Sequence, residues 1–307
     1  MNEKILLAVV GPTAIGKTSL AILLAQHFHT EIVSADSRQF FREMTLGTAV
    51  PSPSELEAAP HHFIGHKSIF EPYSVGDFEK DALALLGQLF SRHDRVVMVG
   101  GSGLYVDAVV KGLDGFPPTD PALRHTLNRR LLDQGLKSLQ GELLQRDPEY
   151  YKKVDLGNPH RLIRALEVSI STGRPYSSFL GQPKAERPFK SLYIGLQAPR
   201  DILYQRIDAR VEVMMGAGLL EEARDLWPHR SRNALQTVGY KELFEYLEGN
   251  CTLDTAVEEI KKNSRRYAKR QMTWLRKNKN ILWVAYDERP QLILDRVADL
   301  INASKDA

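Results

Sequence analysis

Five short apolar runs, separated by longer stretches with helical periodicity, dominate the hydrophobic pattern of the chain. Val, Ile and Leu occupy mostly consecutive positions in each run, which is typical of parallel strands covered by helices on both faces. The runs are Lys4–Val10, Glu31–Asp36, Arg95–Gly101, Ser191–Leu196 and Ile281–Asp287. Their alternation with helical patterns predicts an α/β fold built on a parallel sheet.

The alternation breaks between the third and fourth runs, where residues 116–188 carry only helical patterns. Asp120 followed by Pro121 is typical of a helix start, because Asp caps a free amide and Pro lacks one. A stretch of this length is too long for an ordinary connection. We therefore predict an all-helical subdomain at 116–188, inserted into an α/β core of residues 1–115 and 189–307 that ends in C-terminal helices.

The composition is that of a globular protein, with 43% hydrophobic and 26% charged residues in 307. A single cysteine excludes an internal disulfide and a cysteine-based metal cluster. No apolar run approaches the ~20 residues that span a bilayer, and the apolar run at the N-terminus is too short for a signal peptide. We therefore expect a cytoplasmic protein without a membrane partner.

A strongly basic stretch stands out from an otherwise mildly acidic chain. Residues 261–279 hold nine Lys or Arg and no acidic residue. Because the whole chain carries only +3, the remainder carries −6. On a helix these cations form one broad face, and they would repel one another without a polyanion alongside. The stretch indicates a polyanionic partner. A second stripe at helical spacing, on the opposite face, contains Ile260, Ser264, Tyr267, Gln271 and Trp274.

The first motif with chemical content is GPTAIGKT, Gly11–Thr18, which fits the phosphate-loop pattern G-x-x-x-x-G-K-[ST]. It lies between a predicted strand and a predicted helix, the context that such a loop requires. Its glycines let backbone amides turn toward an anion, and the helix adds its positive end. Lys17 supplies charge to the outer phosphate, and Thr18 offers a hydroxyl to Mg²⁺. The motif predicts phosphate binding and leaves the phosphate compound open.

Two further motifs follow predicted strands. SADSRQFF places Asp36 at the end of the second run, with Ser37, Arg38 and Gln39 behind it, and GGSGLY places Ser102 after the third. Because the carboxyl ends of parallel strands meet at one edge of a sheet, we expect both motifs to lie near the phosphate loop. A carboxylate there can act as a metal ligand or as a general base.

Together these motifs resemble the tRNA dimethylallyltransferase family, whose pattern combines a GPTAxGKT loop, an S-x-D-S-x-Q segment followed by GTA(K)P, and a GGTxLY turn. The chain reads GPTAIGKT, SADSRQFFREMTLGTAVP and GGSGLY, and it contains PHHFI, NPHRLIRALEV, TVGYKE and YAKRQMTWLRK in the family order. The likeness covers almost the whole chain. It departs at Phe41, Val50, Ser102 and His160, where Tyr, Lys, Thr and Arg or Gln are common. None of these removes an expected catalytic group.

The resemblance implies a P-loop NTPase-like core that performs alkyl transfer without consuming ATP. The loop would bind the diphosphate of dimethylallyl diphosphate, with Mg²⁺ at Thr18, and the acceptor would be N6 of adenosine 37 in tRNA. Asp36 would be the general base, and Arg210 would contact the diphosphate beside Lys17. The implied diphosphate-binding residues are Gly11, Pro12, Thr13, Ala14, Ile15, Gly16, Lys17 and Thr18.

The resemblance and the basic stretch together imply where the tRNA anticodon loop binds. We expect the protein to act as a monomer. The expected tRNA contacts lie beside the reaction centre, in the helical insertion and on the basic helix. These contacts are Asp36, Ser37, Arg38, Gln39, Ser102, Arg124, His160, Arg161, Arg164, Lys269, Arg270 and Gln271.

Three other functions stay open from the sequence. A small-molecule kinase would use the same loop for ATP, but it leaves the basic stretch unexplained. An adenylate prenyltransferase would share the chemistry on free AMP, which needs neither the insertion nor a basic helix. A non-catalytic RNA-binding module would have no use for Lys17, Thr18 and Asp36.

Overall fold

The computed structural model describes residues 3–182 and 186–305 of the chain. These form two compact units. Unit 1 comprises Met1–Lys111 with Arg187–Ala307, and unit 2 comprises Gly112–Glu186. The sequence placed the corresponding boundaries a few residues further along the chain. Each unit has a hydrophobic core of its own residues.

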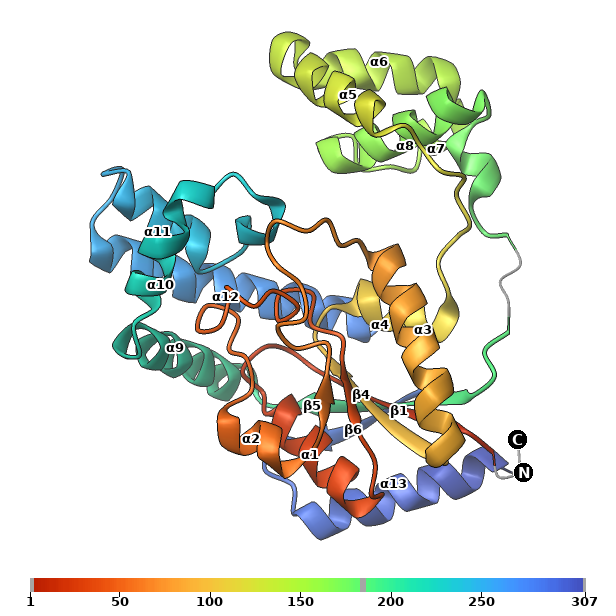
Figure 1. Cartoon of the computed structure of the whole chain (residues 1–307), viewed down its shortest axis with the longest axis vertical. Helices are drawn as coiled ribbons and strands as arrows, with labels where there is room; N and C mark the ends of the chain where they lie inside the picture. Colours follow the sequence, from red (N-terminus) through yellow and green to blue (C-terminus); the bar gives the residue numbers. More distant parts are fainter. Residues whose placement is uncertain (1–2, 183–185, 306–307) are drawn as a thin grey trace. The chain divides into compact units, whose positions relative to one another are not determined.

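Unit 1 is built on a six-stranded parallel sheet with the strand order β3-β2-β4-β1-β5-β6 (Figure 1). The strands are β1 (Ile5–Val10), β2 (Ile32–Ser34), β3 (His61–His62), β4 (Arg95–Gly100), β5 (Lys190–Gln197) and β6 (Ile281–Ala285). Five of them fall within or around the predicted apolar runs, so the predicted α/β fold is confirmed. The sequence missed β3, because two histidines carry no apolar pattern.

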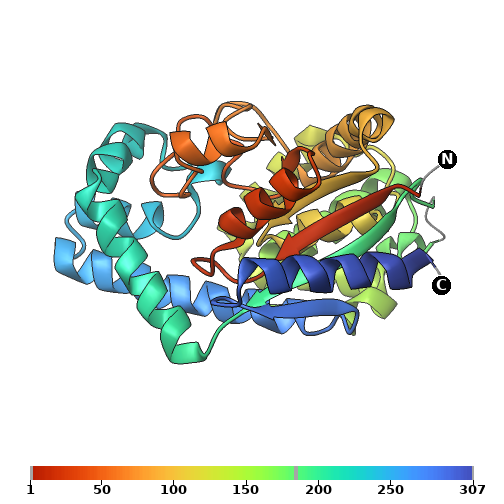
Figure 2. The ribbon, with the colours of Figure 1, turned by 90° about the horizontal axis from the view of Figure 1, so that it is seen from below.

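The sheet separates two hydrophobic layers, because successive residues of a strand point to opposite faces. The odd-numbered residues of β1 pack with α1 (Lys17–His27) and α13 (Pro290–Lys305). Its even-numbered residues pack with α3 (Val75–Arg92) and α4 (Gly103–Lys111). In Figure 2, α1 (red) and α13 (dark blue) lie in front of the strands. All six residues of β1 are buried, so this strand is the centre of the unit.

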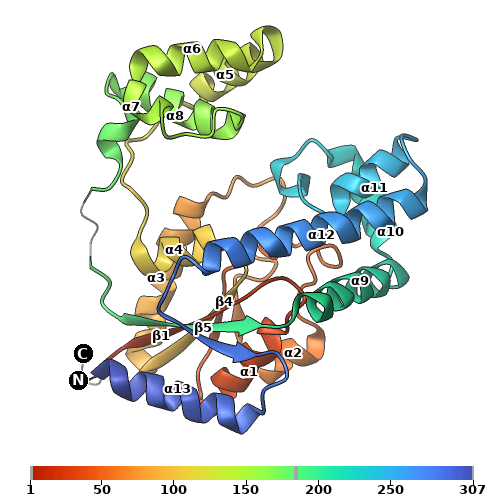
Figure 3. The ribbon, with the colours of Figure 1, turned by 180° about the vertical axis from the view of Figure 1, so that it is seen from behind.

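Most of the remaining helices of unit 1 extend beyond the carboxyl ends of the strands. Their bounds are α2 (Pro53–Ala58), α9 (Arg200–Gly216), α10 (Leu219–Leu226), α11 (Tyr240–Leu247) and α12 (Leu253–Leu275), with short 3₁₀ turns η2 (Trp227–His229) and η3 (Asn233–Leu235). α12 packs against α4, α9 and α11, and Figure 3 shows it as the longest helix of this region. α12 therefore brings most of the basic stretch to the sheet edge where ligands bind in folds of this class.

Unit 2 is helical and contains no strand within its described residues. Its elements are α5 (Pro121–Gln134), α6 (Leu136–Arg146), α7 (Pro148–Tyr151), α8 (Pro159–Thr172) and the 3₁₀ helix η1 (Tyr176–Phe179). As predicted, Asp120 caps α5 by accepting the amide of Ala122. Asn158 caps α8 through the amide of Arg161. The fully buried core leucines are Leu139, Leu143, Leu162 and Leu166.

Candidate active site

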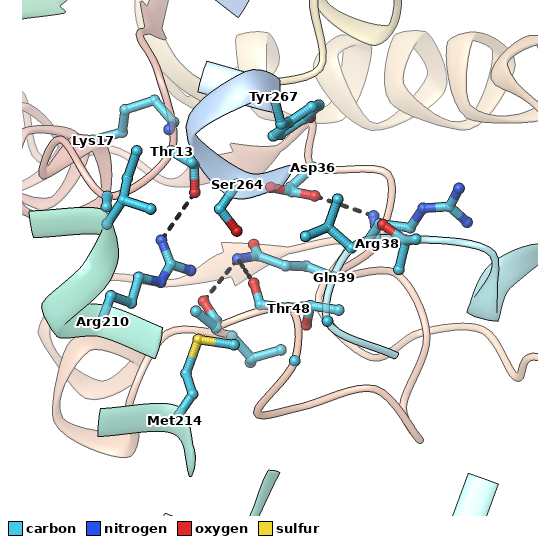
Figure 4. A pocket seen from close by; sticks show the side chains of 18 of the residues that line it. Thr13, Lys17, Asp36, Arg38, Gln39, Thr48, Arg210, Met214, Ser264 and Tyr267 are labelled. Carbon is cyan, nitrogen blue, oxygen red and sulfur yellow. Dashed lines mark hydrogen bonds between the residues drawn. The ribbon is translucent and has the colours of Figure 1, made fainter. Parts of the chain in front are cut away.

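A cavity of about 830 Å³ opens at the carboxyl edge of the sheet in unit 1. Its walls come from the phosphate loop, the segment after β2, the loop of residues 47–51, α9 and α12, several of whose side chains appear in Figure 4. The predicted site residues that line it are Thr13, Ala14, Ile15, Gly16, Lys17, Thr18, Asp36, Ser37, Arg38, Gln39, Arg210, Arg270 and Gln271. Motifs that lie far apart in the sequence thus share one site.

The phosphate loop has the backbone geometry that its glycines allow. Gly16 ends the loop with a φ of 106°, a left-handed conformation that ordinary side chains disfavour, and it caps α1. A Cβ at Gly11 would lie 3.0 Å from the carbonyl oxygen of Leu196 on β5, so a side chain there would crowd the sheet. Gly16, Lys17, Thr18 and Ser19, at the start of α1, line the cavity, so an anion bound there would meet the positive end of the helix.

Lys17 is placed to meet an anion in this loop. Its Nζ donates to the carbonyl of Pro12 at 2.8 Å. Burial lowers the pKa of Lys17 to about 8, although the charge of Asp36 raises it, and Arg210 lowers it further. A bound diphosphate would reverse this loss, because an adjacent negative charge stabilises the ammonium.

Two arginines of α9 add positive charge beside the loop. Arg210 donates to the hydroxyl of Thr13 at 3.2 Å, as the dashed line in Figure 4 shows. Arg206 donates to the carbonyl of Ala14 at 2.9 Å and also lines the cavity. Arg206 was not predicted from the sequence, although its position four residues before Arg210 puts both on one helix face. The geometry favours an anionic ligand.

The reaction centre predicted around Asp36 lies against α12. The carboxylate of Asp36 accepts the amide of Arg38 at 3.1 Å. The hydroxyls of Ser37 and Ser102 lie 3.3 Å apart, so the two predicted strand ends do meet. Tyr267 on α12 lines the same cavity, and burial, followed by the charge of Asp36, raises its pKa. The sequence had placed Tyr267 only on the second stripe of the basic helix.

Three predicted RNA contacts have their polar groups engaged within unit 1. Arg38 donates to the carbonyls of Asn233 and Ala234 at 3.1 and 2.9 Å. Gln39 donates its amide to the carbonyls of two residues of the 47–51 loop, at 3.2 and 2.9 Å. The third is Gln271, only 7% exposed, which accepts the amide of Thr13 and donates to the carbonyl of Gly101, both at 2.9 Å.

These bonds change what the three side chains offer. Each side chain holds neighbouring segments of the site together, so part of its hydrogen-bonding capacity is already used within unit 1. Gln271 in particular joins α12 to the phosphate loop. Their contact with RNA stays a prediction.

A family model described as IPP transferase matches residues 39–278, which is more than half of the chain. The chain belongs to this family. The tRNA dimethylallyltransferase of Christiangramia forsetii is 58% identical over 97% of this chain and 98% of its own length. That of Flavobacterium johnsoniae is 53% identical over 98% of this chain and 99% of its own length.

Solved structures agree with this assignment. The tRNA isopentenylpyrophosphate transferase of Bacillus halodurans superposes with a TM-score of 0.72 at 37% identity, covering 98% of this chain and 96% of that one. A eukaryotic dimethylallyltransferase acting on tRNA gives a TM-score of 0.84 at 25% identity, covering 98% of this chain and 80% of that one. The IPP transferase fold therefore extends over nearly the whole chain.

The basic stretch of this IPP transferase is less uniform than its sequence suggested. Lys261 pairs with Glu212 and Glu258, and Arg265 pairs with Asp208 on α9. A fourth pair joins Lys262 to Glu259. The expectation that only a polyanion could relieve the repulsion is therefore wrong for the first part of the stretch. The Lys and Arg residues of the stretch that have no carboxylate partner in the described part of the chain are Arg266, Lys269, Arg270, Arg276, Lys277 and Lys279.

The predicted RNA contacts of the insertion lie in unit 2. Arg124 binds the buried carboxylate of Glu167 through two nitrogens, and Arg164 lies 3.7 Å from the same group. The charge of Arg124 is therefore already balanced inside this unit. His160 and Arg161 are exposed at the first turn of α8. None of the helices within the described residues is long and apolar enough to cross a membrane.

Proposed function

We propose that this IPP transferase moves a dimethylallyl group from dimethylallyl diphosphate to N6 of adenosine 37 in tRNA and releases diphosphate. The observation that carries the proposal is the shared cavity, which Lys17, Arg210 and Asp36 all line. Lys17 and Arg210 would face the leaving diphosphate, and Asp36 would lie near the nucleophile. The names of the relatives support tRNA as the acceptor.

The leaving group would be stabilised by the loop and by α9. As the bond from C1 of the alkyl chain to the diphosphate oxygen breaks, its electron pair stays on the diphosphate. Lys17, Arg210, Arg206 and the amides at the start of α1 would neutralise that charge from fixed positions. Donors that are already oriented stabilise developing charge without reorganisation.

Mg²⁺ is the metal that these residues would accept with the diphosphate. Among the described residues no group of three His, Cys, Asp or Glu is placed to hold a metal ion, so the described chain lacks a resident site of that kind. Mg²⁺ usually keeps several of its waters and binds through substrate phosphates, and the hydroxyl of Thr18 at the loop would hold it beside them. It would supply further charge neutralisation of the diphosphate.

Asp36 would take the proton from the nucleophile. The exocyclic amine of adenine is a weak nucleophile, since its lone pair is conjugated with the ring. N6 forms a bond to C1 as the C1–oxygen bond breaks, and the surplus proton on N6 goes to the Asp36 carboxylate. A positioned base is typically worth ~10²–10⁴ in rate.

The rest of the cavity would bind the alkyl chain and admit the base. Apolar side chains of α9, α12 and the 238 region line it, namely Ile207, Val211, Met214, Val238 and Ile260. An anticodon-loop base must leave its stack to enter, which costs a few kcal/mol. The unpaired cations of the basic stretch and the exposed start of α8 would offset that cost through backbone contacts.

A transfer assay tests the proposal. The full chain is incubated with labelled dimethylallyl diphosphate, Mg²⁺ and unmodified tRNA, and the label is followed into RNA and mapped to a nucleotide. We expect label on N6 of adenosine 37. Label on free AMP instead would identify an adenylate prenyltransferase. Phosphate transfer from ATP with no alkyl transfer would identify a kinase.

A further inference from the structure

Glu222 on α10 holds a loop that forms one wall of the substrate cavity. Its carboxylate accepts the backbone amides of Thr45, Leu46 and Gly47 at 3.1, 2.8 and 3.0 Å. The hydroxyls of Thr45 and Tyr240 donate to it as well. Within the described part of the chain, no ion pair to a Lys, Arg or His involves Glu222. Neutral donors alone therefore hold this carboxylate.

The charge of Glu222 strengthens this contact. Burial raises the pKa of the carboxyl, but hydrogen bonds from Gly47, Thr45, Tyr240 and Leu46 outweigh it and hold the pKa below its usual value. The group is therefore ionised at neutral pH. An ionised carboxylate accepts several hydrogen bonds at once, each stronger than a bond between neutral groups.

The loop that Glu222 holds is fixed from two other sides. The ring of Tyr240 is fully buried against Gly47, where a Cβ would lie 2.5 Å from the ring. Gln39, which Figure 4 labels together with Thr48, donates to the carbonyls of Thr48 and Ala49. Residues 47–51, which continue this loop, line the cavity. They form its first wall.

The second wall is α9, which connects directly to α10. Arg210 and Met214 project from α9 in Figure 4, with Gln39 and Thr48 beside them. Gly218, with a φ of 104°, turns the chain from α9 into α10. Because Glu222 lies one turn into α10, its bonds to the loop fix the second wall relative to the first.

We propose that Glu222 is a positioning residue that sets the separation of these two walls and thereby limits the length of the alkyl chain that the cavity accepts. Glu222 does not itself line the cavity, so it would act only through the loop. The inference rests on the proposed function, since a chain-length limit has meaning only for a prenyl donor. Two apolar walls can discriminate between alkyl chains that differ by a few carbons, provided that the distance between the walls is fixed.

The test compares two donors on tRNA, dimethylallyl diphosphate with five carbons and geranyl diphosphate with ten. The ratio of their kcat/KM values is measured for the parent, Glu222→Gln and Tyr240→Phe. Glu221→Gln is the matched control, because Glu221 is its exposed neighbour on the same helix. We expect Glu222→Gln to lower the preference for the shorter donor by about tenfold and Tyr240→Phe to lower it less. Glu221→Gln should keep the parent ratio.

The outcomes separate the two proposals. A parent that transfers neither donor to tRNA would overturn the proposed function. A parent that transfers the shorter donor, with Glu222→Gln and Tyr240→Phe folded and showing the parent ratio, would overturn the role of Glu222. A thermal melt reports folding, and if Glu222→Gln does not fold, Tyr240→Phe decides alone, since it removes one hydroxyl from an otherwise intact ring.

Discussion

At the scale of single residues, the carboxylate of Asp36 carries the sharpest chemical expectation. Asp36→Asn keeps the shape of the side chain and an oxygen that can accept the amide of Arg38. It replaces the basic carboxylate with a neutral amide that cannot take a proton. We expect single-turnover alkyl transfer to fall by about 10²-fold or more, while tRNA affinity changes little. Rapid-quench measurement with labelled donor checks the rate, and filter binding checks the affinity. A variant that transfers at the parental rate would place the base on another residue.

Lys17 gives a pH dependence whose sign follows from its environment. Its pKa is lowered to about 8, so the ammonium is charged below that pH and neutral above it. Since the anion needs the charged form, diphosphate affinity should weaken as the pH rises through about 8. Calorimetric titration with diphosphate below and above that pH measures this change in affinity.

Two variants of Lys17 serve as controls for that titration. Lys17→Met should bind diphosphate more weakly at low pH and lack the fall in affinity near pH 8, because position 17 then carries no titratable group. Lys17→Arg should move the step beyond the range, since a guanidinium keeps its charge. An identical step in parent and Lys17→Met would assign the titration to the diphosphate itself.

At the scale of elements, α12 is divided into a paired and an unpaired part. Lys262 is exposed and pairs with Glu259, whereas Lys269 is exposed without a carboxylate partner in the part of the chain that the structure describes. We expect Lys269→Gln to weaken tRNA binding and to flatten its dependence on log salt by about 0.7–0.9 for each phosphate that is no longer neutralised. Lys262→Gln, the matched neutralisation, should change both less. Equal effects from the two variants would mean that only total charge matters.

The sequence identified the elements of the core better than the contacts among them. Buried strands such as β1 carry their own signal, because every side chain must be apolar, while β3 carries none. The loop and Asp36 were found because their residue types and strand positions are dictated by local geometry. The bonds of Gln271 and Arg38 to other segments of unit 1 could not be predicted, because nothing local shows which polar groups tertiary packing will engage. Glu222 was missed for the same reason, since its partners lie some 175 residues earlier in the chain.

At the scale of the whole molecule, the division into two units separates two kinds of binding. Unit 1 contains the complete cavity, and unit 2 has its own leucine core. A chain in which residues 112–186 are replaced by a short Gly-Ser linker should still bind diphosphate with near-parental affinity. It should bind tRNA more weakly, because the proposed contacts at the start of α8 are gone.

Equilibrium titrations of both ligands against the shortened chain measure these effects. A circular dichroism melt serves as the control for the integrity of the core. Parental tRNA affinity in the shortened chain would show that unit 2 makes no contribution to RNA binding.

The two hydrogen bonds of Gln271 provide a physical connection through which tRNA binding and diphosphate binding can influence each other. A single amide joins the helix that carries the unpaired cations to Thr13 of the phosphate loop and to Gly101. A Cβ at Gly101 would lie 2.3 Å from the nitrogen of that amide, so only glycine leaves room for this contact. We expect a displacement of α12 on RNA binding to reach the loop through this side chain. By thermodynamic reciprocity, the factor by which tRNA changes the affinity for diphosphate must equal the factor by which diphosphate changes the affinity for tRNA.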